Sequence, residues 1–135
     1  MNIRTLQNDF ILLVGRLLLS FMFVISGVNK IMAFTATADY MSAAGLPAAS
    51  LLLVLTIAVE VLGGLAIAIG WQTRWAALVI FLFLIPVTYV FHAFWNVDPA
   101  QAQNQMNHFM KNLTIMGGML YLLATGPGRI SADRR

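Results

Sequence analysis

The stretch from Leu51 to Gly70 reads LLLVLTIAVEVLGGLAIAIG. About twenty mostly apolar residues are enough for a helix to cross the hydrocarbon core of a bilayer. One residue of this stretch does not suit hydrocarbon, the carboxylic acid Glu60 near its middle. Because an ionisable side chain in a span costs at least about 2.5 kcal/mol on insertion scales, Glu60 requires a partner or a polar cavity.

The composition of the whole chain also indicates a membrane protein. The chain has 135 residues, of which 60% are hydrophobic and only 10% are charged. Soluble domains usually carry about a quarter of charged residues, so this composition excludes an ordinary water-facing surface. We therefore expect an all-α integral membrane protein.

Four segments are long and apolar enough to be predicted as spanning helices. We expect them to pack as a four-helix bundle with antiparallel neighbours, in a single domain over residues 1–135. The predicted spans are Phe10–Ala33, Ala48–Gly70, Thr73–Trp95 and His108–Thr125. Phe34–Pro47 and Asn96–Asn107 are expected as connections. The first span contains Arg16 and exceeds the usual apolar part of a secretory signal, so we expect it to be retained.

The basic residues predict the orientation of these spans. The connections between the first and second spans and between the third and fourth contain no Lys or Arg. Arginines instead occupy the N-terminus, the second connection and the C-terminus: Arg4, Arg74, Arg129, Arg134 and Arg135. The positive-inside rule then places both termini in the cytoplasm. This also accounts for the net charge of +3 without a nucleic-acid partner.

Helical spacing brings charged residues to one face of the first two spans. Arg16 and Lys30 share a face of the first helix, and Glu60 lies on the same face of the second as Gly63 and Gly64. From helix rise, Arg16 and Glu60 differ in depth by about 6 Å, whereas Lys30 lies near the outer edge. Depth alone therefore favours Arg16 over Lys30 as the partner of Glu60. The pair either locks the bundle, or Glu60 belongs to a proton or ligand site.

Three cationic or titratable side chains lie at similar depth in the outer half. They are Lys30, His92 and Lys111. The acids available in this half are Asp39 and Asp98, which lie in the connections. Such a group predicts a pocket toward the periplasmic leaflet that accepts a lipid phosphate or a quinone head group, with Lys30 as the main donor. In the alternative, the side chains extend outward to separate lipid head groups.

The two histidines, His92 and His108, both lie near the outer face. They could supply axial ligands to a haem or hydrogen bonds to a quinone carbonyl, although His92 as a simple interfacial polar residue explains the pattern as well. The absence of cysteine from the sequence excludes thiol catalysis, disulfides and cysteine-held iron–sulfur clusters in this chain. We expect no metal site and no covalently bound cofactor.

Three stretches resemble the DoxX family of small bacterial membrane proteins. They are RLLLSFMFVISGVNKI from Arg16, VEVLGGLAIAIGWQTRWAA from Val59, and GPGRISADRR from Gly126. The resemblance implies a four-helix protein of the bacterial inner membrane. Relatives include the large subunit of a thiosulfate:quinone oxidoreductase and a member of a membrane-associated oxidoreductase complex. By the family pattern Lys30 and Glu60 are the candidate functional residues, with Arg16 and Arg74 next.

Two functional hypotheses follow. In the first, the protein is a membrane subunit of an oxidoreductase system, and a pocket with Glu60, Lys30 and His92 receives a quinone head group or passes a proton. The chain holds no complete redox centre, so this hypothesis needs a redox partner protein. In the second, the protein is not catalytic and binds or stabilises a partner, with its charges as structural pairs. Membrane lipids are expected partners in both, and an oligomer is compatible with both.

The orientation can be tested with reporter fusions. A reporter fused after Arg135 should lie in the cytoplasm, and one inserted at Gln103 should lie in the opposite compartment, because the arginines hold their ends inside. A periplasmic location for the fusion at Arg135 contradicts the four-span arrangement.

Overall fold

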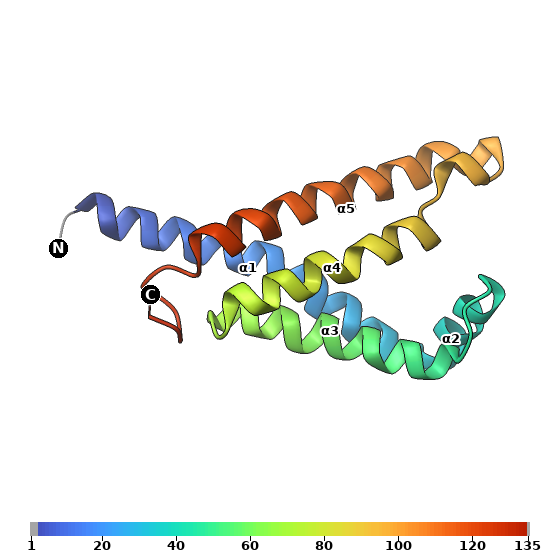
Figure 1. The fold of residues 1–135 in the computed structure, drawn as a ribbon, viewed down its shortest axis with the longest axis horizontal. Helices are drawn as coiled ribbons and strands as arrows, with labels where there is room; N and C mark the ends of the chain where they lie inside the picture. The colour runs from blue at the N-terminus through green and yellow to red at the C-terminus, as the bar shows by residue number, and fades with distance from the viewer. Residues whose placement is uncertain (1–2, 135) are drawn as a thin grey trace.

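The computed structural model describes residues 3–134, which fold entirely into helices and their connections. In Figure 1 the long helices run along the length of the molecule. The helices are α1 (Ile3–Met32), α2 (Phe34–Ala43), α3 (Ala49–Ile69), α4 (Thr73–Phe91), the 3-10 helix η1 (Phe94–Asn96) and α5 (Pro99–Thr125).

Three of the described helical segments are long and apolar enough to cross a membrane. They are α1, α3 and the segment Thr73–Asn96, which contains α4. These coincide with the first three predicted spans. The last long helix, α5, is not among them, because its first turns are polar and Lys111 and Asn112 interrupt its apolar part.

Two segments predicted as connections are largely helical. Phe34–Pro47 contains α2, and α5 begins at Pro99, well before the predicted start at His108. Proline is well suited to the first turn of a helix, and the Ala and Gln residues that follow are good helix formers. The polar residues correctly mark the ends of the apolar segments, but they do not mark the ends of the helical structure.

The long helices share one core. Each of them contributes to a single buried cluster: Phe23 from α1, Ile67 from α3, Ile80 from α4 and Met119 from α5. A second cluster, with Ala38, Met41 and Leu53, packs α2 against α3. The short helix is thus fixed to the rest of the structure by apolar contacts.

Small residues bring α1 and α3 close together, as the glycines around Glu60 predict. A Cβ atom on Gly64 would come within 2.9 Å of Val24 Cγ2 and 3.3 Å of the Ser20 carbonyl oxygen. Gly27 faces α3 in the same way, against Val61 and Glu60. Larger residues at either position would push the two helices apart.

The two ends of the molecule differ in charge. The N-terminal end of α1, the turn between α3 and α4 and the segment after α5 lie at one end, whereas α2 and η1 lie at the other (Figure 1). The segments at the first end carry Arg4, Arg74, Arg129 and Arg134, which matches the predicted grouping. Arg135 lies outside the described residues.

The segment after α5, residues 126–134, folds back over the arginine-rich end. We call it the tail segment. Its backbone N–H groups at Ala132 and Asp133 donate to the carbonyl oxygens of Ile69 (3.0 Å) and Gly70 (2.9 Å) at the end of α3. The N–H of Arg129 donates to Asp9 Oδ1 of α1 at 3.0 Å. The tail segment therefore ties α1 and α3 together.

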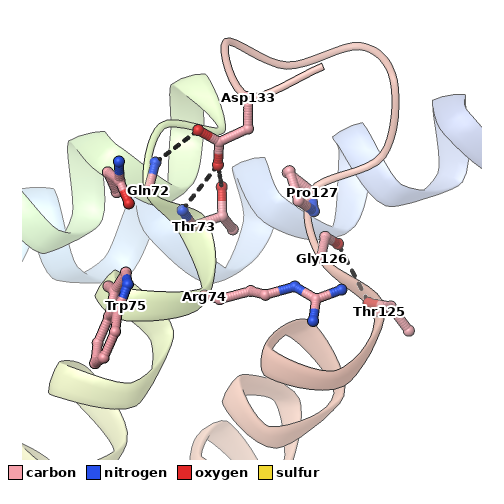
Figure 2. Close-up of a pocket in the computed structure, with 8 residues that line it drawn as sticks. All are labelled: Gln72, Thr73, Arg74, Trp75, Thr125, Gly126, Pro127 and Asp133. Carbon is pink, nitrogen blue, oxygen red and sulfur yellow. Dashed lines mark hydrogen bonds between the residues drawn. The ribbon is translucent and has the colours of Figure 1, made fainter. Parts of the chain in front are cut away.

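The tail segment also caps α4. The carboxylate of Asp133 accepts from the backbone N–H groups of Gln72 (3.0 Å) and Thr73 (3.1 Å), and from the Thr73 hydroxyl (3.3 Å) (Figure 2). The residue at the N-cap position, Gln72, makes no such bond with its own side chain. An acid distant in sequence thus satisfies the free N–H groups and complements the positive end of the helix dipole.

Removing this cap should destabilise the fold. We expect Asp133→Ala to lower the free energy of unfolding by about 1–2 kcal/mol, the usual cost of losing a cap, measured by thermal unfolding in detergent. Asp98→Ala is the matched control, because Asp98 stands at the N-cap position of α5 without a side-chain cap bond. Equal losses in the two variants would contradict the capping assignment.

Candidate functional site

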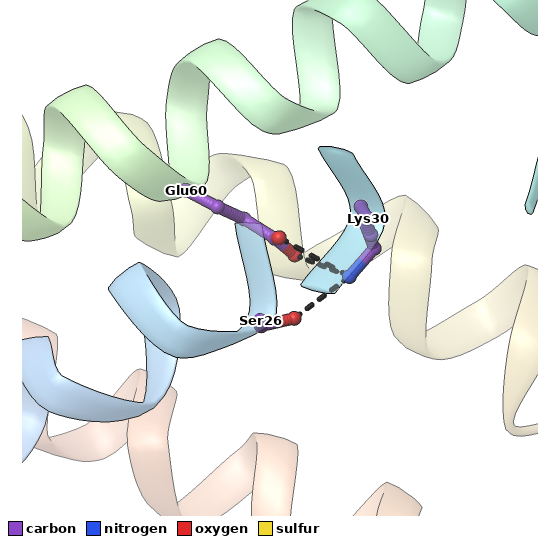
Figure 3. Close-up of polar contacts among 3 residues, drawn as sticks. All are labelled: Ser26, Lys30 and Glu60. Carbon is purple, nitrogen blue, oxygen red and sulfur yellow. Dashed lines mark hydrogen bonds and ion pairs between the residues drawn. The ribbon is translucent and has the colours of Figure 1, made fainter. Parts of the chain in front are cut away.

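Glu60 forms an ion pair with Lys30 in the apolar part of the structure. Lys30 Nζ lies 3.1 Å from both carboxylate oxygens of Glu60 and donates to Ser26 Oγ at 2.7 Å (Figure 3). The Glu60 side chain is 8% exposed and that of Lys30 is 28% exposed. The pair is therefore largely enclosed.

The packing of α1 on α3 explains why these two residues meet. Gly27 of α1 faces Glu60 and Val61 of α3, so Lys30 lies one turn further toward the α2 end. Side chains on a helix lean toward its N-terminus. Since α1 and α3 are antiparallel, Lys30 leans back toward Ser26 while Glu60 leans toward the level of Lys30.

The prediction that Arg16 is the partner of Glu60 is wrong. Arg16 lies at the opposite end of the α1–α3 contact, where its Nη1 atom is against Gly70. Gly70 is ten residues beyond Glu60, about 15 Å of helix rise. Arg16 is 1% exposed, and its Nη2 atom donates to the carbonyl oxygen of Ile130 at 2.6 Å. The depth estimate failed because it did not include the tail segment, which supplies this acceptor.

The ion pair borders a cavity of about 220 Å³, which we call the Glu60 cavity. It lies between α1, α2, α3 and α4. Its polar lining residues are Lys30, Thr37, Tyr40, Thr56, Glu60 and His92. The remaining wall is formed by Met41, Phe83, Val87 and Phe91. The structure thus brings three of the predicted site residues, Lys30, Glu60 and His92, to the lining of one cavity.

His92 directly follows α4, as its C-cap residue, and connects this cavity with α5. Its Nδ1 atom lies 2.9 Å from Gln105 Oε1, and its ring stacks on that of His108 with centroids 5.1 Å apart. Axial ligands lie on opposite faces of a haem, and stacked rings leave no room for the macrocycle between them. The arrangement therefore suits a hydrogen-bonding role for His92 better than haem ligation.

Lys111 and Arg74 lie outside the Glu60 cavity. Lys111 is an exposed residue of α5 and does not line the cavity. Arg74, in the first turn of α4, extends toward Gly126 and lines a separate cavity of about 150 Å³ next to the tail segment (Figure 2). Asp133 also borders that cavity but is engaged in capping α4. The predicted outer group of three is therefore reduced to Lys30 and His92.

The sequence did not point to two lining residues, Thr37 and Tyr40. Both belong to α2, which lies within the segment predicted as a connection. The Tyr40 ring stacks on Phe91 with centroids 5.6 Å apart and so joins α2 to the end of α4. The pattern of apolar residues in α2 that packs on α3, Ala38 and Met41, is the signal that could have revealed it.

No metal centre is formed by the described residues. Among residues 3–134, no three His, Asp or Glu side chains gather closely enough to hold a metal ion. The chemistry that the Glu60 cavity can offer is hydrogen bonding and proton exchange by Lys30, Glu60 and His92, next to an apolar wall.

Comparison with known proteins places the chain among membrane proteins. The DoxX family model matches residues 11–93, from α1 through α4. The inner membrane protein YqjF of Escherichia coli (strain K12) is 41% identical over 127 residues, which cover 94% of this chain and 92% of the relative. The inner membrane protein YphA of the same organism is 33% identical over 125 residues, covering 93% and 89%.

A part of the chain is also similar to a yeast protein. The Surfeit locus protein 4 homolog of Schizosaccharomyces pombe is 32% identical over 71 residues, which cover 51% of this chain and 24% of the relative. No solved structure matches the chain. Because the family model covers residues 11–93 and YqjF is similar over almost its whole length, the chain belongs to the DoxX family.

Proposed function

We propose that the protein is a four-span bundle of the bacterial inner membrane with both termini in the cytoplasm. The shared core of the four long helices supports this arrangement, since α5 packs its apolar half against α4 and contributes Met119 and Leu122. The arginines at one end support the orientation. YqjF and YphA, which are similar over almost all of the chain, bear the name of inner membrane proteins.

Within this bundle, we propose that the Glu60 cavity receives the head group of a quinone. The protein then serves as the membrane subunit of an oxidoreductase system. The single observation that carries the proposal is the position of the Lys30–Glu60 pair, which borders a cavity with an otherwise mostly apolar wall between α1, α2, α3 and α4. A cavity of about 150 Å³ is enough for benzene, so a volume of about 220 Å³ suits one substituted ring.

The chemistry of the pair fits such a ring. The Lys30 ammonium has three N–H donors, and two of them point to the same carboxylate, so one can turn to a quinone carbonyl oxygen while the other keeps the ion pair. The Glu60 carboxylate has about four acceptor sites, and among residues 3–134 only Lys30 bonds to it. An acceptor site is thus left for the hydroxyl group of a reduced quinone. His92 lies in the same lining and can exchange a proton.

The alternative is a non-catalytic membrane protein in which the ion pair holds α1 and α3 together. The observation in its favour is that the pair is well satisfied, because Ser26 and both carboxylate oxygens surround Lys30 Nζ. The two interpretations differ in what happens when both charges are removed together.

The quinone proposal can be tested by ligand binding to the purified protein in nanodiscs. We expect the wild type to bind the chain-free ring dimethoxymethylbenzoquinone, measured by isothermal titration calorimetry. Lys30→Met and Glu60→Gln should each weaken binding by at least about tenfold, or 1.4 kcal/mol. Lys111→Met is the matched control and should bind as the wild type does. Absence of wild-type binding, or equal binding by all variants, would favour the alternative.

A double variant separates binding from stability. Removing one charge strands the other in an apolar site, so Glu60→Gln should lower the free energy of unfolding by about 3 kcal/mol. Replacing both charges by apolar residues of similar size, as in Lys30→Met with Glu60→Met, should recover most of that loss. We expect this double variant to be folded and unable to bind the ring. A stable double variant that still binds would show that the pair is not part of the site.

A further inference from the structure

A second cavity adjoins the Glu60 cavity. It has a volume of about 230 Å³ and lies between α3 and α4, and we call it the Pro86 cavity. The two cavities have five lining residues in common: Met41, Thr56, Phe83, Val87 and Phe91. They are therefore neighbouring compartments with a shared wall.

The chemical character changes across this wall. The residues that line only the Pro86 cavity are all apolar: Leu46, Leu52, Leu55, Val59, Pro86 and Val90. Thr56 is the one polar side chain in its lining. The Glu60 cavity, in contrast, holds the ion pair and His92. Together the two compartments match a molecule with a polar ring at one end and a hydrocarbon chain at the other.

The Pro86 cavity opens sideways from the bundle. Leu55 of α3 and Val90 of α4 both line it, and they are 54% and 38% exposed on the outer surface of their helices. At the α2 end of the Glu60 cavity, the stacked rings of Tyr40 and Phe91 form part of the wall. An open route therefore runs between α3 and α4 into the surrounding lipid.

We propose that the two cavities form one site for a membrane-dissolved amphiphile. Its polar ring lies at Lys30 and Glu60, and its hydrocarbon chain passes through the Pro86 cavity and leaves between α3 and α4. The inference rests on the proposed function and names the class of its ligand, a quinone with a long apolar chain that enters directly from the bilayer.

The Pro86 cavity contributes space for the ligand chain and little binding free energy. Lipid chains are as apolar as leucine side chains, so a ligand chain gains little by moving from lipid into this cavity. A bulky side chain in the cavity would instead exclude the ligand chain by overlap while leaving the ring site open. Filling the cavity should thus discriminate between ligands with and without a chain.

The experiment compares two probes, dimethoxymethylbenzoquinone and decylubiquinone, which carry the same ring without and with a hydrocarbon chain. Affinities are measured in the same nanodiscs for the wild type, Val90→Phe and Val79→Phe. Val79 is the matched control, because it lies on α4 in an exposed position and lines a different groove. Partition of the decyl chain into lipid is the same for every variant and cancels in the ratio of affinities.

We expect Val90→Phe to weaken decylubiquinone binding by at least tenfold and to change the affinity for the chain-free ring by less than twofold. Val79→Phe should change neither. If Val90→Phe leaves both affinities unchanged, or lowers both equally, the chain does not occupy the Pro86 cavity and the inference fails while the ring site stands. If the wild type binds neither probe, the proposed function itself fails.

Discussion

The ion pair between Lys30 and Glu60 sets how α1 lies against α3, and the rest of the structure depends on that contact. Neither charge can be solvated by the lipid, so each must find its partner on the neighbouring helix. Gly27, level with Glu60, and Gly64, one turn further toward the arginine-rich end, let the two backbones approach closely along this contact. Sliding one helix past the other by a turn would separate the charges and bring Cβ atoms into the place of glycines.

The same register of α1 against α3 determines which group Arg16, the second cation on α1, can contact. Arg16 and Lys30 share a face of the helix, yet they are served by different partners. Lys30 meets a carboxylate inside the apolar layer, whereas Arg16 meets a backbone carbonyl oxygen of the tail segment at the end of the bundle. One end of the α1–α3 contact is therefore closed by polypeptide, and the other borders a cavity.

The sequence allowed the helices and the polar faces to be predicted, because hydrocarbon imposes strong rules on composition and charge. Helices of sufficient length and apolarity lie where the first three spans were predicted, and the close approach at Gly64 is confirmed. The partner of Arg16 was not accessible from helix depth, since it depends on residues 126–134 folding back against α3. Similarly, α2 mixes polar and apolar residues, and composition there does not separate a helix from a loop. Because α2 was not predicted, Thr37 and Tyr40 were not predicted to line the Glu60 cavity.

The tail segment has a consequence for the order of assembly during synthesis. It follows α5 in the chain, so the ribosome produces it after all of the long helices. Chains emerge at roughly 5–20 residues per second, and until residues 126–134 appear the Arg16 guanidinium lacks its acceptor at Ile130 and the first turn of α4 lacks the carboxylate of Asp133. Until then, water must satisfy these polar groups of α1 and α4. Closure of the arginine-rich end therefore requires that all of the long helices have been synthesised.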